Sequence, residues 1–360
     1  MPTSAAHPSD PHRSPKRTSH DLGTTGGAGP AHPSHAHRPP PREGGVKSPA
    51  WRRALTAVFA VAVVAGAVAA LRGQDWSVLA GLLHGGSVAA LLGATAVTAA
   101  GLLCGTRSWM LTLSTIAVPI PAGTGVRMFF VGFLGKFIPG RVWGLIAQMR
   151  MGERAGATKA QLAGTYLVNL VIVLLTGGAV GLLVAPTLLP DGAAWLLLLP
   201  LAMLIALVAR PTLIHALVGL AARVARRQPP PAPGQPANLR LAVVYQTVAW
   251  VLSGLHVWVI AVLLGAEPLP ALPAAVGGYS LAVVAGTLAV FAPDGVGVRE
   301  LLLVPALVPV LPLHAAVATA LGSRVLTLVA ELVTSGAALG AVALRARATA
   351  PAPIRKETPA

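Results

Sequence analysis

The chain has 360 residues, of which 54% are hydrophobic and only 11% are charged, and its formal net charge is +16. Its mean hydropathy of +0.71 excludes an ordinary soluble domain and predicts a helical membrane protein with several spans. The basic residues lie in clusters between apolar runs and not in one patch, so nucleic acid is not expected as a partner.

Residues 1–50 are rich in Pro, Ser, Gly, His and Arg and contain almost no large apolar side chain. Such a segment buries too little surface to offset its chain entropy, so we expect a disordered, basic cytoplasmic tail. The transmembrane domain is expected to cover residues 51–345, and residues 346–360 are expected to form a short second cytoplasmic tail.

Eight apolar runs are candidates for membrane spans, although the seventh is short for a hydrocarbon layer about 30 Å thick. They cover residues 54–71, 87–103, 162–185, 193–208, 241–264, 272–292, 301–313 and 315–344. Most lysines and arginines fall in the tails and in alternate loops, the pattern typical of cytoplasmic segments. The sequence therefore predicts an all-α, polytopic membrane helical bundle of about eight spans in the cytoplasmic membrane, with both termini in the cytoplasm.

A first break interrupts the apolar run 128–147 with the segment Gly135-Lys136-Phe137-Ile138-Pro139-Gly140-Arg141-Val142-Trp143. Pro139 removes an amide donor and Gly140 permits a sharp turn. A helix break inside hydrocarbon is tolerated only where protein or water forms hydrogen bonds with the unpaired backbone amides and carbonyls. The two cations beside the break, Lys136 and Arg141, are suited to bind a lipid phosphate. Two interpretations stay open, namely a segment that re-enters the membrane and an interfacial amphipathic helix whose cations reach anionic headgroups.

A second break, Pro293-Asp294-Gly295-Val296-Gly297-Val298-Arg299-Glu300, separates the sixth and seventh runs. Its opposite charges either pair with each other or bind a zwitterionic or cationic headgroup. For Asp294 the favoured interpretation is a helix cap. Each half of the chain would then hold four spans and one break after its second span, as expected of a duplication about an axis along the membrane normal.

The last run contains two ionisable residues, Arg324 and Glu331. Such groups are costly inside a membrane and face a cavity or a partner. Their spacing of seven places them on one helix face, two turns apart, which is too far for a tight direct pair. We expect Glu300 as the partner of Arg324, and Arg299 or Lys136 as the partner of Glu331, in a headgroup site or in a purely structural bridge.

No motif in the sequence indicates an enzyme or a bound cofactor. The Gly-rich phosphate loop of nucleotide hydrolases and the common metal-binding and nucleophile motifs are all missing. No nucleotide hydrolysis is therefore expected of this chain.

The two breaks together resemble the flippase-like family of integral membrane proteins, which is related to the transmembrane region of lysylphosphatidylglycerol synthases. The resemblance rests on Lys136-Phe-Ile-Pro-Gly-Arg-Val-Trp143 and Ala292-Pro-Asp-Gly-Val-Gly-Val-Arg-Glu300, and it covers roughly residues 54–344. The family's second motif usually reads Pro-Gly-Gly, whereas Asp294 fills the middle position here. Because these residues include no counterpart of the synthases' soluble aminoacyl-transferring domain, the resemblance implies lipid translocation without synthetic activity.

The sequence thus predicts a lipid translocase that moves a phospholipid or polyprenyl-phosphate-linked headgroup between leaflets. Its expected partners are anionic or prenyl-phosphate lipids and proteins of cell-envelope biosynthesis. Two alternatives are a non-transporting accessory of lipid-linked glycan assembly and a membrane-embedded lipid transferase that uses Asp294 or Glu331 as a base. The predicted headgroup and translocation residues are Lys136, Pro139, Gly140, Arg141, Trp143, Pro293, Asp294, Gly295, Gly297, Arg299, Glu300, Arg324 and Glu331.

Overall fold

The computed structural model describes residues 61, 85–137, 142–184, 194–210, 212–224, 226, 236–289, 293–295 and 297–348. Within these ranges the chain forms helices joined by turns, without a β-strand, so the all-α prediction is confirmed. The predicted tail 1–50 and, apart from residue 61, the predicted span 54–71 lie outside the described residues. Of the predicted C-terminal tail 346–360, residues 346–348 continue the last helix and the rest also lies outside.

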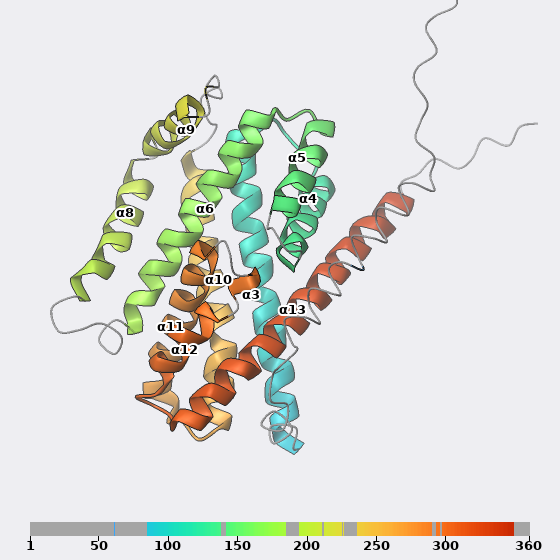
Figure 1. Ribbon diagram of the computed structural model, residues 1–360. Coiled ribbons are helices and arrows are strands. Elements are labelled where there is room, and N and C mark those ends of the chain that lie inside the picture. Colours follow the sequence, from blue (N-terminus) through green and yellow to red (C-terminus); the bar gives the residue numbers. More distant parts are fainter. Residues whose placement is uncertain are drawn as a thin grey trace, which may run out of the picture. The chain divides into compact units, whose positions relative to one another are not determined.

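Ten α-helices and four short 3₁₀ helices make up the described elements (Figure 1). The α-helices are α3 (Gly85–Ile116), α4 (Ala122–Leu134), α5 (Val142–Arg154), α6 (Lys159–Gly181), α8 (Leu198–Ala209), α9 (Thr212–Val224), α10 (Pro236–Leu263), α11 (Pro268–Leu288), α12 (Val298–Leu307) and α13 (Leu313–Ala348). The 3₁₀ helices are η1 (Gly135–Phe137), η2 (Leu182–Val184), η3 (Ala194–Leu197) and η4 (Pro293–Gly295).

Five of the described helices, α3, α6, α10, α11 and α13, are long and apolar enough to cross a membrane. They correspond to the second, third, fifth, sixth and eighth predicted spans. In the fourth predicted span, α8 has 12 residues. In the seventh, α12 has 10 residues and therefore extends only about 15 Å, half of a bilayer's hydrocarbon thickness. Pro309 and Pro312 follow its end and prevent its continuation.

The centre of the bundle is the antiparallel pair α3 and α10, which α6 joins from one side. Ser108 Oγ on α3 donates a hydrogen bond to the carbonyl of Ala242 on α10 at 2.8 Å. Gly101 allows the closest approach, because a Cβ there would lie 2.6 Å from Ser253 Oγ. Small residues at a helix contact are typical of membrane bundles, where dispersion and interhelical hydrogen bonds drive association.

The hydrogen bond between α10 and α6 makes a testable contribution to stability. The indole of Trp250 donates to Thr176 Oγ1 at 3.0 Å, so Thr176→Val leaves a buried donor without its acceptor. We expect a loss of about 1 kcal/mol in the free energy of unfolding, measured as a lower Tm of the purified protein in detergent. The control is Thr247→Val, whose hydroxyl donates to the Val243 carbonyl within its own helix, and an equal loss in both variants would contradict an interhelical role.

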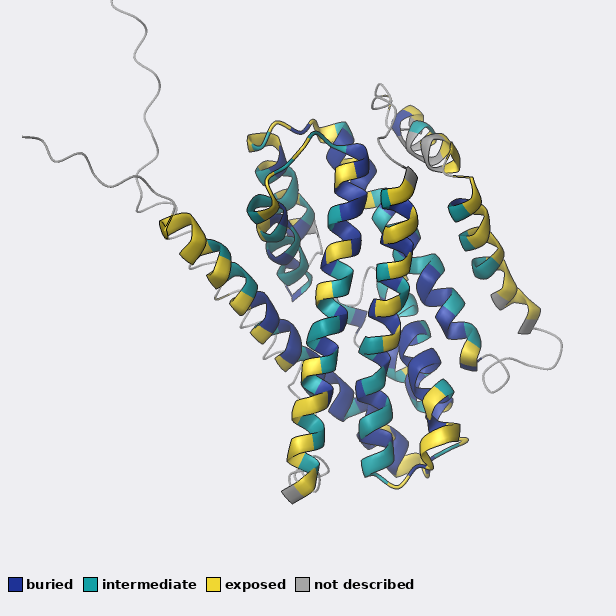
Figure 2. Cartoon of the chain, turned by 180° about the vertical axis from the view of Figure 1, so that it is seen from behind, coloured by how far each residue is buried: buried dark blue, intermediate teal, exposed yellow. Residues whose placement is uncertain are grey.

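The exterior of the bundle is apolar. Large hydrophobic side chains such as Ile205 of α8, Val244 of α10 and Val333 of α13 are 60%, 56% and 63% exposed, and the outward faces of these helices are coloured as exposed in Figure 2. A soluble protein rarely exposes so much contiguous apolar surface. This exterior fits the multi-pass membrane protein that the sequence predicts.

The two ends of the bundle differ in charge. The end at which α3 meets the start of α10 carries the basic residues, among them Arg154 and Arg210, whereas the opposite end, at the turn between α10 and α11, carries Glu267. Among the described residues, no lysine or arginine lies at that opposite end.

Both predicted breaks form helical hairpins that enter the bundle. Helices α4 and α5 pack against each other and come from the basic end, whereas α11 and α12 pack together and come from the opposite end (Figure 1). Their tips, η1 and η4, are in contact. The first break therefore re-enters the bundle and does not lie flat on its surface. Because the hairpins enter from opposite ends, the predicted duplication about an axis along the membrane normal is wrong.

Candidate functional site

Glycines bring the two arms of the first hairpin together just below its tip. A Cβ on Gly135 would lie 2.4 Å from the Cα of Gly144, and a Cβ on Gly144 would lie 2.2 Å from the carbonyl oxygen of Gly132. The arms therefore pack backbone against backbone, which extends η1 and its Lys136 into the bundle. Pro139, Gly140 and Arg141, which the sequence also predicts as site residues, lie outside the described residues, so their roles stay predictions.

The tip of the second hairpin adopts left-handed backbone conformations. Asp294, Gly295 and Gly297 have φ angles of 47°, 68° and 84°. This region favours glycine, and Asp is one of the few other residues that it tolerates. The tip also approaches α11 closely, because a Cβ on Gly295 would lie 2.7 Å from the Cα of Gly286. Pro293 begins η4 at this turn.

Asp294 does not cap a helix, so that interpretation of it is wrong. The N-cap of α12 is Gly297, whose amide donates to Glu300 Oε2 at 2.8 Å. The Asp294 side chain is instead surrounded by Lys136 of η1, Arg299 of α12 and Arg324 of α13.

Lys136 connects the first hairpin to the second hairpin and to α13. Its Nζ lies 2.7 Å from Glu331 Oε1 and 3.3 Å from Asp294 Oδ1. The ammonium also lies over the rings of Phe133 and Phe137, at 4.5 and 5.1 Å from their centroids, where cation–π attraction stabilises it. Since Glu331 is near the middle of the 36-residue α13, the tip of the first hairpin reaches the interior of the bundle.

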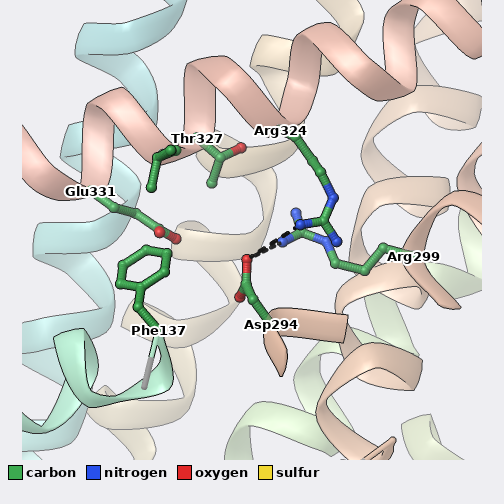
Figure 3. A pocket seen from close by; sticks show the side chains of 7 residues that line it. Phe137, Asp294, Arg299, Arg324, Thr327 and Glu331 are labelled. Atoms are coloured by element: carbon green, nitrogen blue, oxygen red, sulfur yellow. Dashed lines mark hydrogen bonds and ion pairs between the residues drawn. The ribbon is translucent and has the colours of Figure 1, made fainter. Parts of the chain in front are cut away.

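Two arginines complete the cluster on the other side of Asp294 (Figure 3). Arg299 Nη1 lies 3.5 Å and Arg324 Nη1 3.8 Å from Asp294 Oδ2. Arg324 Nε also donates to Glu300 Oε1. The predicted pairing of Arg324 with Glu300 is thus confirmed, and of the two candidate partners for Glu331, Arg299 and Lys136, it is Lys136 that forms the ion pair.

We call these six side chains the ion cluster: Lys136, Asp294, Arg299, Glu300, Arg324 and Glu331. Three are cations and three are carboxylates, so their formal charges cancel. Their side-chain exposures range from 6% for Arg324 to 26% for Glu300. Charges withdrawn from water to this degree persist only when they are paired, and removing one partner leaves another uncompensated.

A narrow pocket opens beside the ion cluster. Its volume is about 10 Å³, room for about one water molecule, and it is lined by Phe137, Asp294, Arg299, Arg324, Thr327, Leu328 and Glu331. Arg324 Nη2 is buried without a hydrogen-bond partner among the described residues. A buried guanidinium donor left over beside a pocket is suited to an additional anionic or carbonyl oxygen.

Several residues around the ion cluster are not among the predicted headgroup residues. The Tyr279 ring lies beneath the Arg299 guanidinium at 5.6 Å and contacts the ring of His256 edge to face at 4.9 Å. His256 Nε2 in turn lies 2.7 Å from Ser323 Oγ on α13. A lone Tyr in an apolar run gives no signal of such a role, whereas a His in such a run predicts an interhelical hydrogen bond, and the contact of His256 with α13 confirms that prediction. Thr327 does give a signal of such a role, because it precedes Glu331 by one helical turn and therefore shares its face.

Trp143 is a predicted site residue that the structure does not place at the pocket beside the ion cluster. It lies at the start of α5, is 53% exposed, and is not among the residues that line the pocket.

The chain matches the family described as "Lysylphosphatidylglycerol synthase TM region" over residues 57–334, which is most of its length and includes both hairpins. No curated protein matches it significantly.

Proposed function

Because the chain belongs to the family of the lysylphosphatidylglycerol synthase transmembrane region, we propose that it moves the headgroup of a phosphate-bearing lipid between the two leaflets of the cytoplasmic membrane. The proposal involves no chemical step and no cofactor. The phosphate would be held by Lys136, Arg299 and Arg324, while the acyl or prenyl chains stay in the bilayer.

The observation that carries the proposal is the meeting of two hairpin tips at the ion cluster in mid-bundle. Irregular backbone inside a membrane is tolerated where it lines a site or cavity, and broken helices of this kind form the substrate sites of many transporters. Three cations within reach of one pocket supply the charge-assisted hydrogen bonds that a phosphate requires.

The opposite directions of the hairpins support a transport role over simple binding. Withdrawal of the α4–α5 tip would open the ion cluster toward the basic end, and withdrawal of the α11–α12 tip would open it toward the other end. If the two tips withdraw alternately, the headgroup site faces one leaflet at a time. The basic end would be cytoplasmic by the positive-inside rule, which would also place the end of α13 on the cytoplasmic side.

A vesicle assay with Arg299→Ala tests the proposal. Purified protein is reconstituted in phosphatidylcholine vesicles with a trace of phospholipid labelled on an acyl chain, and dithionite reports arrival of the label in the outer leaflet. We expect Arg299→Ala to lower the rate about tenfold, since losing one charge-assisted contact costs about 1.5–3 kcal/mol.

The matched control is Arg150→Ala, because Arg150 is an exposed arginine on α5 and its loss should leave the rate unchanged. Equal rates for wild type and Arg299→Ala would refute the assignment. Lipid that co-purifies with the protein but is never moved would favour the non-transporting accessory instead.

A further inference from the structure

Within the ion cluster, Asp294 is the carboxylate shared by all three cations. Its Oδ1 lies 3.3 Å from Lys136 Nζ, and its Oδ2 lies 3.5 Å from Arg299 Nη1 and 3.8 Å from Arg324 Nη1. One carboxylate thus occupies the position that a bound phosphate would need in order to contact the same three groups.

The backbone indicates that this placement serves more than local folding. Asp294 has a φ of 47°, a conformation that glycine adopts without steric cost and that Asp adopts less readily. The side chain makes no helix-capping contact and its ion pairs all run to the cations of the cluster. The carboxylate is therefore the feature that distinguishes this position from a plain glycine turn.

The charge balance restricts which headgroup the site accepts. With Asp294 in place the three cations and three carboxylates already cancel. A headgroup with a phosphate alone would add an uncompensated negative charge among side chains that are mostly buried, which is unfavourable. A headgroup that also carries an ammonium group would add no net charge.

We propose that Asp294 is an internal anion that a zwitterionic headgroup displaces: the lipid phosphate takes over the contacts with Arg299, Arg324 and Lys136, and the released carboxylate pairs with the lipid's ammonium group. The preferred substrate class is then a phospholipid with an amino headgroup. This inference rests on the proposed translocase function and deepens it.

The geometry favours displacement of the Asp294 carboxylate by the phosphate over displacement of Glu300 or Glu331. The contacts of Asp294 with the arginines, 3.5 and 3.8 Å, are longer than the 2.7 Å pair of Lys136 and Glu331, so they are the weaker ones. The unpartnered Nη2 of Arg324 supplies a first donor for the incoming phosphate.

Two substitutions at Asp294 remove the charge and keep the turn. Asn and Gly both accept left-handed conformations, so Asp294→Asn and Asp294→Gly should fold. In either variant the cations exceed the carboxylates by one, and a purely anionic headgroup becomes the one that restores neutrality. Glu153→Gln, which neutralises an exposed carboxylate paired with Lys159 on the surface, is the matched control.

The test compares two lipids in phosphatidylcholine vesicles, phosphatidylethanolamine and phosphatidylglycerol, each labelled on an acyl chain so that its headgroup is intact. Wild type and Glu153→Gln are expected to move phosphatidylethanolamine about tenfold faster than phosphatidylglycerol. Both Asp294 variants are expected to reverse that preference, because a change of one charge in the site is large enough to alter the relative rates to this extent.

Each outcome decides between the two proposals. If wild type moves phosphatidylglycerol as fast as phosphatidylethanolamine, or if a folded Asp294 variant keeps the wild-type ranking, the exchange mechanism is wrong and the translocase function stands. If wild type moves neither lipid faster than protein-free vesicles do, the translocase function itself fails.

Discussion

Replacing Lys136 by Met is expected to abolish lipid translocation and to lower the free energy of unfolding by about 3–5 kcal/mol. Lys136 lies 2.7 Å from Glu331 and 3.3 Å from Asp294, so its loss leaves two largely buried carboxylates without their shared cation. It also detaches the tip of the first hairpin from α13.

The double variant Lys136→Met/Glu331→Leu separates the effect on folding from the effect on function. A buried ion pair replaced by apolar side chains of similar size costs little stability, so most of the lost free energy of unfolding should return. Translocation should not return, because the phosphate site has lost a cation. Stability is measured by thermal unfolding in detergent and translocation by the dithionite assay.

The matched control is Lys159→Met. The Lys159–Glu153 pair lies at the surface, with side chains 61% and 36% exposed, and such pairs contribute about 0–1 kcal/mol. Translocation at the wild-type rate by the Lys136→Met/Glu331→Leu double variant would show that the ion cluster is only a structural bridge.

A single methyl group at Gly144 is expected to disable the first hairpin. In Gly144→Ala the new Cβ would lie 2.2 Å from the carbonyl oxygen of Gly132. Because the obstacle is backbone, no side-chain rotation relieves the clash, and α5 must move away from α4. A shift of about 1 Å at a site can lower a rate about 100-fold, and overpacking costs about 1–3 kcal/mol, so we expect losses of this size in translocation and in stability.

Gly340→Ala is the control for this effect. Gly340 is an exposed residue of α13, and a Cβ there meets nothing within 4 Å. Alanine should therefore raise stability by about 0.5–1 kcal/mol, as is usual in an exposed helix interior, and leave the rate unchanged. If Gly144→Ala behaved like Gly340→Ala, the close packing of the hairpin arms would be irrelevant to transport.

The residue pattern alone is enough to predict a helical membrane protein with several spans and to locate its two backbone breaks. A bilayer makes polar groups costly, so long apolar runs predict membrane-spanning helices. For the same reason an ionisable residue inside such a run, such as Arg324 or Glu331, predicts a charged partner. The same reasoning indicates Glu300 as the partner of Arg324, but it leaves Arg299 and Lys136 as alternatives for Glu331. The breaks at Pro139 and Pro293 were visible because proline and glycine change the backbone locally.

The contact between the two hairpin tips follows from the tertiary structure and not from local sequence. The sequence leaves open whether Lys136 enters the membrane or lies on its surface, because a short charged segment has the same residue pattern in both cases. What holds it inside is Glu331, 195 residues further along the chain, and the glycine contacts that bring α4 against α5. Likewise, local sequence favours a helix cap for Asp294, whereas in the folded chain Lys136, Arg299 and Arg324 surround its carboxylate. Local sequence fixes where the backbone breaks, but the stability of a buried charge depends on partners that only folding brings together.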